Sequence, residues 1–144
     1  MFRPPLFRIL FSFVRLAAAL LPAAGAFAAD TGRPLSAAEF EALSVGRTFF
    51  YEADGVPYGA EQYLPGRKVV WAFVGDDCRK GSWYEDAGYI CFVYEDSAEP
   101  QCWTFEASPT GLMARFRDDP GGAPLVGVRQ SPAPLACLGP DVGV

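Results

Sequence analysis

The chain has 144 residues, a formal net charge of −5 and no histidine. Because Ser-His-Asp catalysis, Cys-His catalysis and zinc sites with histidine ligands need the imidazole side chain, the missing histidine excludes them. The acidic balance excludes nucleic acid as a partner and disfavours anionic lipid surfaces, since like charges repel.

Residues 1–28 have the pattern of a cleavable secretory signal peptide. Two arginines precede a mostly apolar stretch over residues 9–21, and small residues follow to Ala26 and Ala28, which suit the cleavage enzyme. A membrane anchor would need about 20 apolar residues, and Arg15 interrupts this stretch. Cleavage after Ala28 removes three of the twelve basic residues and none of the seventeen acidic ones, so the charge becomes −8. We therefore expect an exported protein with no stable membrane insertion after cleavage.

The exported part is long enough for one domain. Residues 29–34 form a short polar leader, and residues 35–144 form the single domain. Scarce lysine, asparagine and isoleucine beside abundant alanine, glycine, proline and arginine indicate a GC-rich bacterial genome. The expected location is therefore the periplasm or the medium outside the cell.

The domain is predicted to begin with one short helix. Ser36 is a suitable N-cap, and Glu39, three residues later, completes a capping box. Leu35 and Phe40 stand where a hydrophobic staple places its two apolar residues. Gly46 can end the helix with a positive φ.

Everything after Gly46 is predicted as short strands separated by turns rich in glycine, proline and aspartate. Strands with such short connections pair antiparallel, and closure of the sheet removes its exposed edges. The sequence therefore predicts a mainly β fold, an up-and-down barrel of about eight strands preceded by one helix, with a two-sheet sandwich as the alternative. The expected strands are 47–52, 58–64, 67–74, 82–85, 89–95, 101–106, 112–117 and 124–130.

Two of these strands are apolar on both faces. Residues 69–74 and 90–94 contain few polar side chains, so both strands should be central. We expect the core on one face and the helix or the C-terminal tail on the other. Residues 103–106 and 112–117 instead alternate between apolar and polar, as half-buried strands do.

The four cysteines are expected to form two disulfides. An even number of cysteines in an exported domain favours disulfides. The chain has no C-x-x-C pair, which would have favoured a metal site. If the turn of hairpin 89–106 centres on residues 96–97, Cys91 lies opposite Cys102. Of the three possible connectivities, this one pairs Cys78 with Cys137 and ties the proline-rich tail to the 75–81 loop. By restricting the unfolded chain, the two bonds should stabilise the fold by about 3 and about 4 kcal/mol, respectively.

The chain resembles a group of small, secreted, uncharacterised alphaproteobacterial proteins that share a domain of unknown function. The resemblance covers nearly the whole exported part and implies export and a β fold, with no activity. More loosely, the expected architecture is similar to small periplasmic protease-inhibitor barrels, which implies nothing about function. The residues that carry the first resemblance are Tyr63-Leu64-Pro65-Gly66-Arg67, Trp71, Cys78, Gly81-Ser82-Trp83-Tyr84, Ile90-Cys91-Phe92-Val93-Tyr94, Cys102-Trp103 and Cys137-Leu138-Gly139-Pro140.

Aromatic residues concentrated between positions 71 and 105 are the candidate ligand or partner surface, represented by Trp71, Trp83, Tyr84 and Trp103. Aromatic side chains that face a cavity can bind an apolar ligand or stack on a sugar. The alternative is that they fill the barrel, whose interior is only just wide enough for side chains. Three tryptophans that all point inward would leave no room for a ligand.

No catalytic residue is expected. Four acidic pairs lie at predicted turns, where solvated charge explains them better than acid–base catalysis or calcium binding. The serines lack a histidine base, a G-x-S-x-G elbow and an S-x-x-K pair. We therefore expect no enzyme activity, no metal and no cofactor. The acidic pairs are Asp76-Asp77, Glu85-Asp86, Glu95-Asp96 and Asp118-Asp119.

Two functions remain open. The first is a non-enzymatic exported protein that binds another periplasmic or envelope protein, as an inhibitor or a structural component. The alternative is a barrel that binds a small apolar ligand with the aromatic residues. The sequence names neither the partner nor the ligand.

Overall fold

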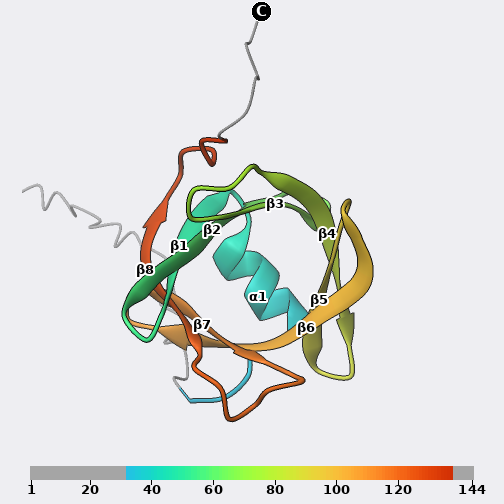
Figure 1. Ribbon diagram of the computed structural model, residues 1–144. Coiled ribbons are helices and arrows are strands. Elements are labelled where there is room, and N and C mark those ends of the chain that lie inside the picture. Colours follow the sequence, from blue (N-terminus) through green and yellow to red (C-terminus); the bar gives the residue numbers. More distant parts are fainter. Residues whose placement is uncertain (1–31, 138–144) are drawn as a thin grey trace, which may run out of the picture.

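The computed structural model of the chain describes residues 32–137. The predicted signal peptide, residues 1–28, lies outside the described residues. Eight strands form a closed barrel around one short helix, α1 (Ala37–Ser44) (Figure 1). The strands are β1 (Arg47–Ala53), β2 (Val56–Leu64), β3 (Lys68–Phe73), β4 (Arg79–Asp86), β5 (Tyr89–Tyr94), β6 (Ser97–Ser108), β7 (Gly111–Phe116) and β8 (Leu125–Ser131).

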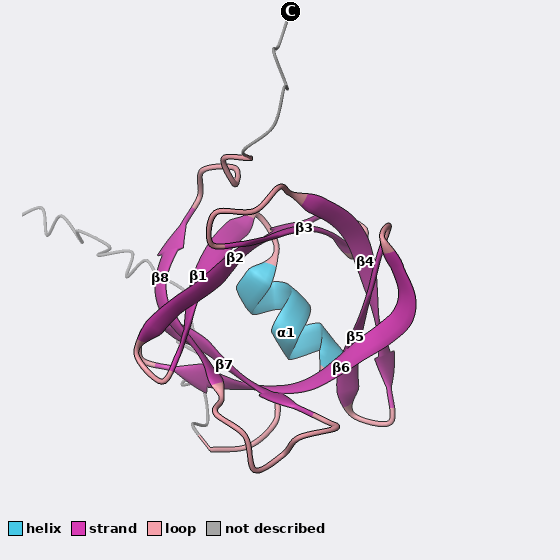
Figure 2. Cartoon of the chain, in the orientation of Figure 1, coloured by secondary structure: helices cyan, strands magenta, loops and turns pink. Residues whose placement is uncertain are grey.

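Every strand pairs antiparallel with the next one along the chain, and β8 pairs with β1 to close the barrel (Figure 2). The pairs Tyr51 with Gly127 and Glu52 with Val126 belong to this closing contact. The up-and-down barrel predicted from the turns is confirmed, and the two-sheet sandwich is wrong. Closure gives backbone partners to β1 and β8, which would otherwise be edge strands.

The helix begins as its sequence predicts. The Ser36 side chain accepts a hydrogen bond from the Glu39 backbone N–H, and the Glu39 carboxylate accepts one from the Ser36 backbone N–H. Gly46 follows the helix with a φ of +79°. Just before the helix, the Leu35 backbone N–H donates to the Phe105 carbonyl at 2.6 Å, which ties this segment to β6.

Helix α1 closes one end of the barrel with the ring of Phe40. This ring is fully buried and lies 4.5 Å from the ring of Phe105 and 5.1 Å from that of Trp83, between centroids. Tyr63 and Phe92 complete the aromatic contacts around it. Viewed along the barrel, α1 crosses the space that the strands surround (Figures 1 and 2). The expectation that the helix could cover the outer face of a central strand is therefore wrong, because Phe40, its one large buried apolar side chain, lies inside the barrel.

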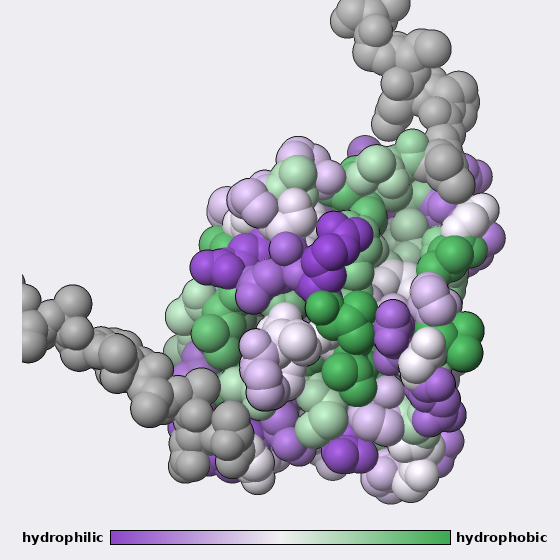
Figure 3. All heavy atoms as spheres, turned by 90° about the vertical axis from the view of Figure 1, so that its left-hand side faces the viewer, coloured by the Kyte–Doolittle hydropathy of each residue, from purple (hydrophilic) through white to green (hydrophobic). Residues whose placement is uncertain are grey.

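The chain after β8 covers part of the outer face instead. The Thr48 hydroxyl donates to the Ala133 carbonyl at 2.8 Å, and the Leu135 backbone N–H donates to Gln62 Oε1 at 3.2 Å. Cys137 then bonds to Cys78, between β3 and β4. On the side of β1 and β8, small apolar and hydrophilic patches alternate over the outer face (Figure 3).

Both expected disulfides are present. Cys91 and Cys102 are direct partners on β5 and β6, with Cα atoms 4.0 Å apart, and the Cα atoms of Cys78 and Cys137 are 5.3 Å apart. The register of this hairpin shifts between Phe92 and Tyr94, which moves the turn to residues 95–96. Strand β6 therefore begins at Ser97, earlier than predicted. Strand β4 also begins earlier than predicted, at Arg79. Among residues 32–137, no helix is long and apolar enough to cross a bilayer.

Removal of the Phe40 ring should destabilise the barrel strongly. We expect Phe40→Ala to lower the free energy of unfolding by about 3–5 kcal/mol, because it leaves a cavity among four aromatic rings. Leu43→Ala is the matched control, since Leu43 is on the same helix and is 39% exposed. Urea unfolding at equilibrium measures the unfolding free energy of both variants. Equal losses in the two variants would contradict the conclusion that the Phe40 ring fills the end of the barrel.

Candidate ligand-binding site at the barrel mouth

The end of the barrel opposite α1 contains a cavity of about 60 Å³ that opens to solvent. It lies where the β3–β4 connection and the β5–β6 turn meet, and Asp96 and Ser97 of that turn line it. Most of its wall is aromatic and includes Tyr51, Tyr58, Trp71, Phe73, Tyr94 and Trp103. We call this opening the barrel mouth.

Two glycines on the inner surface let large rings lie flat against the wall. A Cβ atom at Gly59 would come within 2.6 Å of Trp71 Cζ2, and one at Gly81 would come within 2.8 Å of Tyr94 Cδ1. Real Cβ atoms do not approach so closely, so any other residue would push these rings inward. The glycines of β2 and β4 therefore keep space open between the rings.

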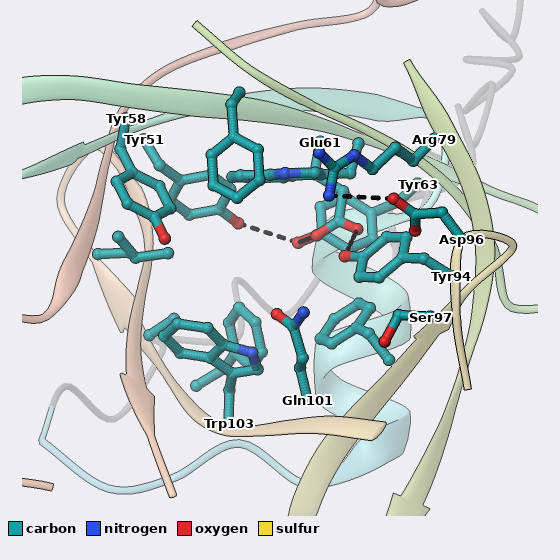
Figure 4. A pocket seen from close by; sticks show the side chains of 16 residues that line it. Tyr51, Tyr58, Glu61, Tyr63, Arg79, Tyr94, Asp96, Ser97, Gln101 and Trp103 are labelled. Carbon is teal, nitrogen blue, oxygen red and sulfur yellow. Dashed lines mark hydrogen bonds and ion pairs between the residues drawn. The ribbon is translucent and has the colours of Figure 1, made fainter. Parts of the chain in front are cut away.

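The floor of the cavity holds one buried carboxylate, that of Glu61. Its side chain comes from the middle of β2, between Phe49 of β1 and Trp71 of β3 in the sheet register, and the residue is 4% exposed. The Tyr63 hydroxyl donates to Glu61 Oε2 at 2.9 Å, and the Tyr94 hydroxyl donates to Oε1 at 2.8 Å (Figure 4).

A third tyrosine extends this network. The Tyr51 and Tyr63 hydroxyl oxygens are 3.0 Å apart. Since the single proton of the Tyr63 hydroxyl is directed to Glu61, Tyr51 is the donor of this bond. Three hydroxyl groups from β1, β2 and β5 thus hold the carboxylate, directly or in relay.

Burial changes the acid–base properties of the network. Loss of solvation raises the pKa of Glu61 to about 7, and the hydrogen bonds from Tyr94 and Tyr63 oppose that rise. Loss of solvation and the nearby Glu61 charge both raise the pKa of the Tyr63 and Tyr94 hydroxyls, so they remain protonated donors. A carboxyl group with a pKa near neutrality in a cavity is typical of functional sites.

An ion pair borders the cavity. Arg79 Nη1 lies 3.2 Å from Asp96 Oδ2, and Arg79 Nη2 lies 4.0 Å from Asp76 Oδ2. The guanidinium is also over the ring of Phe73, 5.2 Å from its centroid. Gln101 and Trp103 of β6 face Glu61 across the cavity (Figure 4). Asp76 and Asp96, expected as solvated turn charges, thus pair with a residue of the mouth.

The structure separates the four residues of the expected aromatic surface. Trp71 and Trp103 line the cavity, whereas Trp83 is buried against Phe40 near the other end of the barrel. Tyr84 belongs to the outer face, where it pairs in register with Cys91, and it is 41% exposed. The expectation that three inward tryptophans leave no room for a ligand is wrong, because Trp83 lies nearer the α1 end of the barrel than Trp71 and Trp103.

Sequence reasoning missed Glu61, the central polar group of the site. Gly59, Glu61 and Tyr63 are on one side of β2, so a carboxylate shares a face with a buried tyrosine. The spacing alone could have shown this, since alternate residues of a strand share a face. The partners Tyr51 and Tyr94 come from other strands, and only the barrel brings them together.

The described part of the chain contains no group of three or more cysteine, aspartate or glutamate side chains arranged to hold a metal ion. No family model, no curated protein and no solved structure matches the chain. The resemblance to small secreted alphaproteobacterial proteins therefore stays a prediction.

The raised pKa of Glu61 predicts a specific dependence of stability on pH. Between about pH 4.5 and 7 the folded protein keeps a proton that the unfolded chain releases, so the Glu61 contribution to stability falls as pH rises through this range. Relative to Glu61→Gln, the wild type should lose about 2 kcal/mol of unfolding free energy between pH 5 and pH 8.

Urea unfolding at several pH values measures this difference. The other ionisable side chains that line the cavity are Tyr51, Tyr58, Tyr63, Arg79, Tyr94 and Asp96. Glu99→Gln is the control, since Glu99 is exposed on the β6 strand. The site description would be contradicted if the wild type and Glu61→Gln changed in parallel with pH.

Proposed function

We propose that this protein is a small-ligand-binding barrel that takes one end of its ligand into the mouth opposite α1. The observation that carries the proposal is the cavity with aromatic walls and one buried carboxylate on its floor. Binding sites for small molecules combine such apolar walls with a few placed polar groups. This is the alternative that the aromatic residues suggested in the sequence.

A comparison of the two ends of the barrel supports placing the ligand at the mouth. Phe40 and the rings around it fill the helix end, so a ligand has no space there. At the other end, Tyr58 lines the cavity and is 37% exposed, and Val74, which is 65% exposed, donates its backbone N–H to the Tyr58 carbonyl. Exposed apolar side chains around an opening favour entry of an apolar or aromatic group.

The volume limits what can enter. A cavity of about 60 Å³ has room for a few water molecules, or for a terminal group of a few non-hydrogen atoms. Because the cavity is open, the rest of the ligand can extend past Tyr58 and Trp103 toward solvent. A lipid-sized ligand does not fit inside this barrel.

We further propose that the ligand is bound outside the cytoplasm, in the periplasm or in the medium. The two disulfides support this location, since such bonds persist in oxidising compartments. The protein-binding role that we expected first stays a prediction. Neither role requires a catalytic residue.

A fragment screen by NMR tests the proposal. Small aromatic alcohols, amines and acids are titrated at millimolar concentration into the disulfide-bonded protein. At least one should give saturable shifts at Tyr58, Gln101 and Trp103 and none at Tyr84, because Tyr84 lies on the outer face. If no fragment produces saturable shifts at the mouth, the proposed function is wrong.

A variant that blocks the mouth tests whether the fragments bind there, and the same substitution elsewhere on β6 is its control. Gln101 lines the cavity but is exposed, so Gln101→Trp should block the opening without disturbing the core and should weaken fragment binding at least tenfold. Glu99→Trp adds the same ring elsewhere on β6 and should leave binding within twofold of the wild type.

A further inference from the structure

The hydrogen-bond donors around the cavity floor are already used. With Glu61 ionised, Tyr63 and Tyr94 give their only hydroxyl protons to its two oxygens, and Tyr51 gives its proton to Tyr63. The network therefore presents only oxygen lone pairs to anything in the cavity. A ligand group that lies against it must itself be a donor.

The charge of the floor is also unbalanced. Within residues 32–137, the described ion pairs include none in which a lysine or arginine nitrogen lies within 4.0 Å of the Glu61 carboxylate. Its partners are neutral hydroxyl groups, and the residue is almost completely buried. A buried carboxylate without a cation is costly, and a positively charged ligand group would remove much of that cost.

The walls suit a cation as well. Tyrosine, tryptophan and phenylalanine rings attract cations to their faces. The mouth already shows this arrangement with a residue of its own, because the Arg79 guanidinium lies over Phe73 and pairs with Asp96. Arg79 forms ion pairs with Asp96 and Asp76, so its positive charge does not make the cavity an anion-binding site.

We propose that the ligand is a small organic amine in its protonated form, with the ammonium group at the Glu61 carboxylate and the apolar part between the rings of the mouth. The inference rests on the proposed function and adds the charge and donor character of the ligand. An ammonium group supplies up to three N–H donors and one positive charge, which match the acceptors and the buried negative charge. The cavity of about 60 Å³ holds this group with its first carbon atoms.

Benzylamine and benzyl alcohol are the probes that test the charge. They share one ring and one methylene group, and only the amine is positively charged at pH 8, where Glu61 is ionised in the folded protein. Calorimetric titration at low salt should show benzylamine binding at least tenfold more tightly than benzyl alcohol. Benzoate, which would bring a second negative charge to the floor, should bind more weakly than either.

The possible outcomes separate this inference from the proposed function. Equal affinities for benzylamine and benzyl alcohol, or a preference for benzoate, overturn the inference while the proposed function stands. No saturable binding of any probe to the folded protein overturns both.

Glu61→Gln gives a second measurement. It should lower the affinity for benzylamine at least tenfold, to the level of benzyl alcohol, and should leave the affinity for benzyl alcohol within about threefold. Glu99→Gln removes the same charge from an exposed site on β6 and should keep the preference for the amine. Loss of the preference in Glu99→Gln as well would indicate general attraction to an acidic protein and overturn the inference.

The wild type alone provides a third measurement, which does not depend on the folding of a variant. Protonation of Glu61 below about pH 7 should weaken benzylamine binding at least tenfold between pH 8 and pH 5. Benzyl alcohol should bind with little change over this range. A benzylamine affinity that does not change with pH overturns the inference. The other ionisable side chains that line the cavity are Tyr51, Tyr58, Tyr63, Arg79, Tyr94 and Asp96.

Discussion

Closure of the eight-stranded sheet forces alternate residues of every strand into one shared interior, and the remaining features of the molecule depend on this constraint. In β2 the constraint buries Glu61 together with Tyr63, although a carboxylate is costly to bury. The cost is reduced because β1 and β5 bring Tyr51 and Tyr94 to the same place. A carboxylate on an open sheet could turn to solvent, whereas this one must find its partners inside the barrel.

Helix α1 makes the two ends of the barrel different. Phe40 fills one end with an aromatic cluster that includes Trp83, so the interior there is continuous packing. Toward the other end, Gly59 and Gly81 let Trp71 and Tyr94 lie along the wall, and a cavity remains. The same set of aromatic residues therefore serves two purposes. Near the helix it stabilises the fold, and at the mouth it forms the wall of a candidate binding site.

The buried carboxylate is a feature that stability alone does not explain. A hydrophobic residue of similar volume at position 61 would avoid the desolvation cost, and such replacements of buried charges are often neutral or stabilising. Groups that lower stability and lie in a cavity are frequent at functional sites. The position of Glu61 at the floor of a strongly aromatic opening fits that pattern. The disulfide from Cys78 to Cys137 ties the chain after β8 to the β3–β4 connection, next to Arg79 of the mouth.

The sequence by itself determined the helix from Ser36 and Glu39, the strands between glycine- and proline-rich turns, and the pairing of Cys91 with Cys102 across one hairpin. These features depend on local periodicity, on turn chemistry and on register within one hairpin, all of which short stretches of sequence encode. Only the tertiary structure decided between the closed barrel and the sandwich, and it alone showed that Phe40 fills the barrel, that Trp83 and Trp103 lie at different heights in it, and that Tyr51 and Tyr94 join Tyr63 around Glu61. The physical reason is that each of these contacts joins distant parts of the chain, and their positions follow from how far each strand is shifted against the next around the closed barrel.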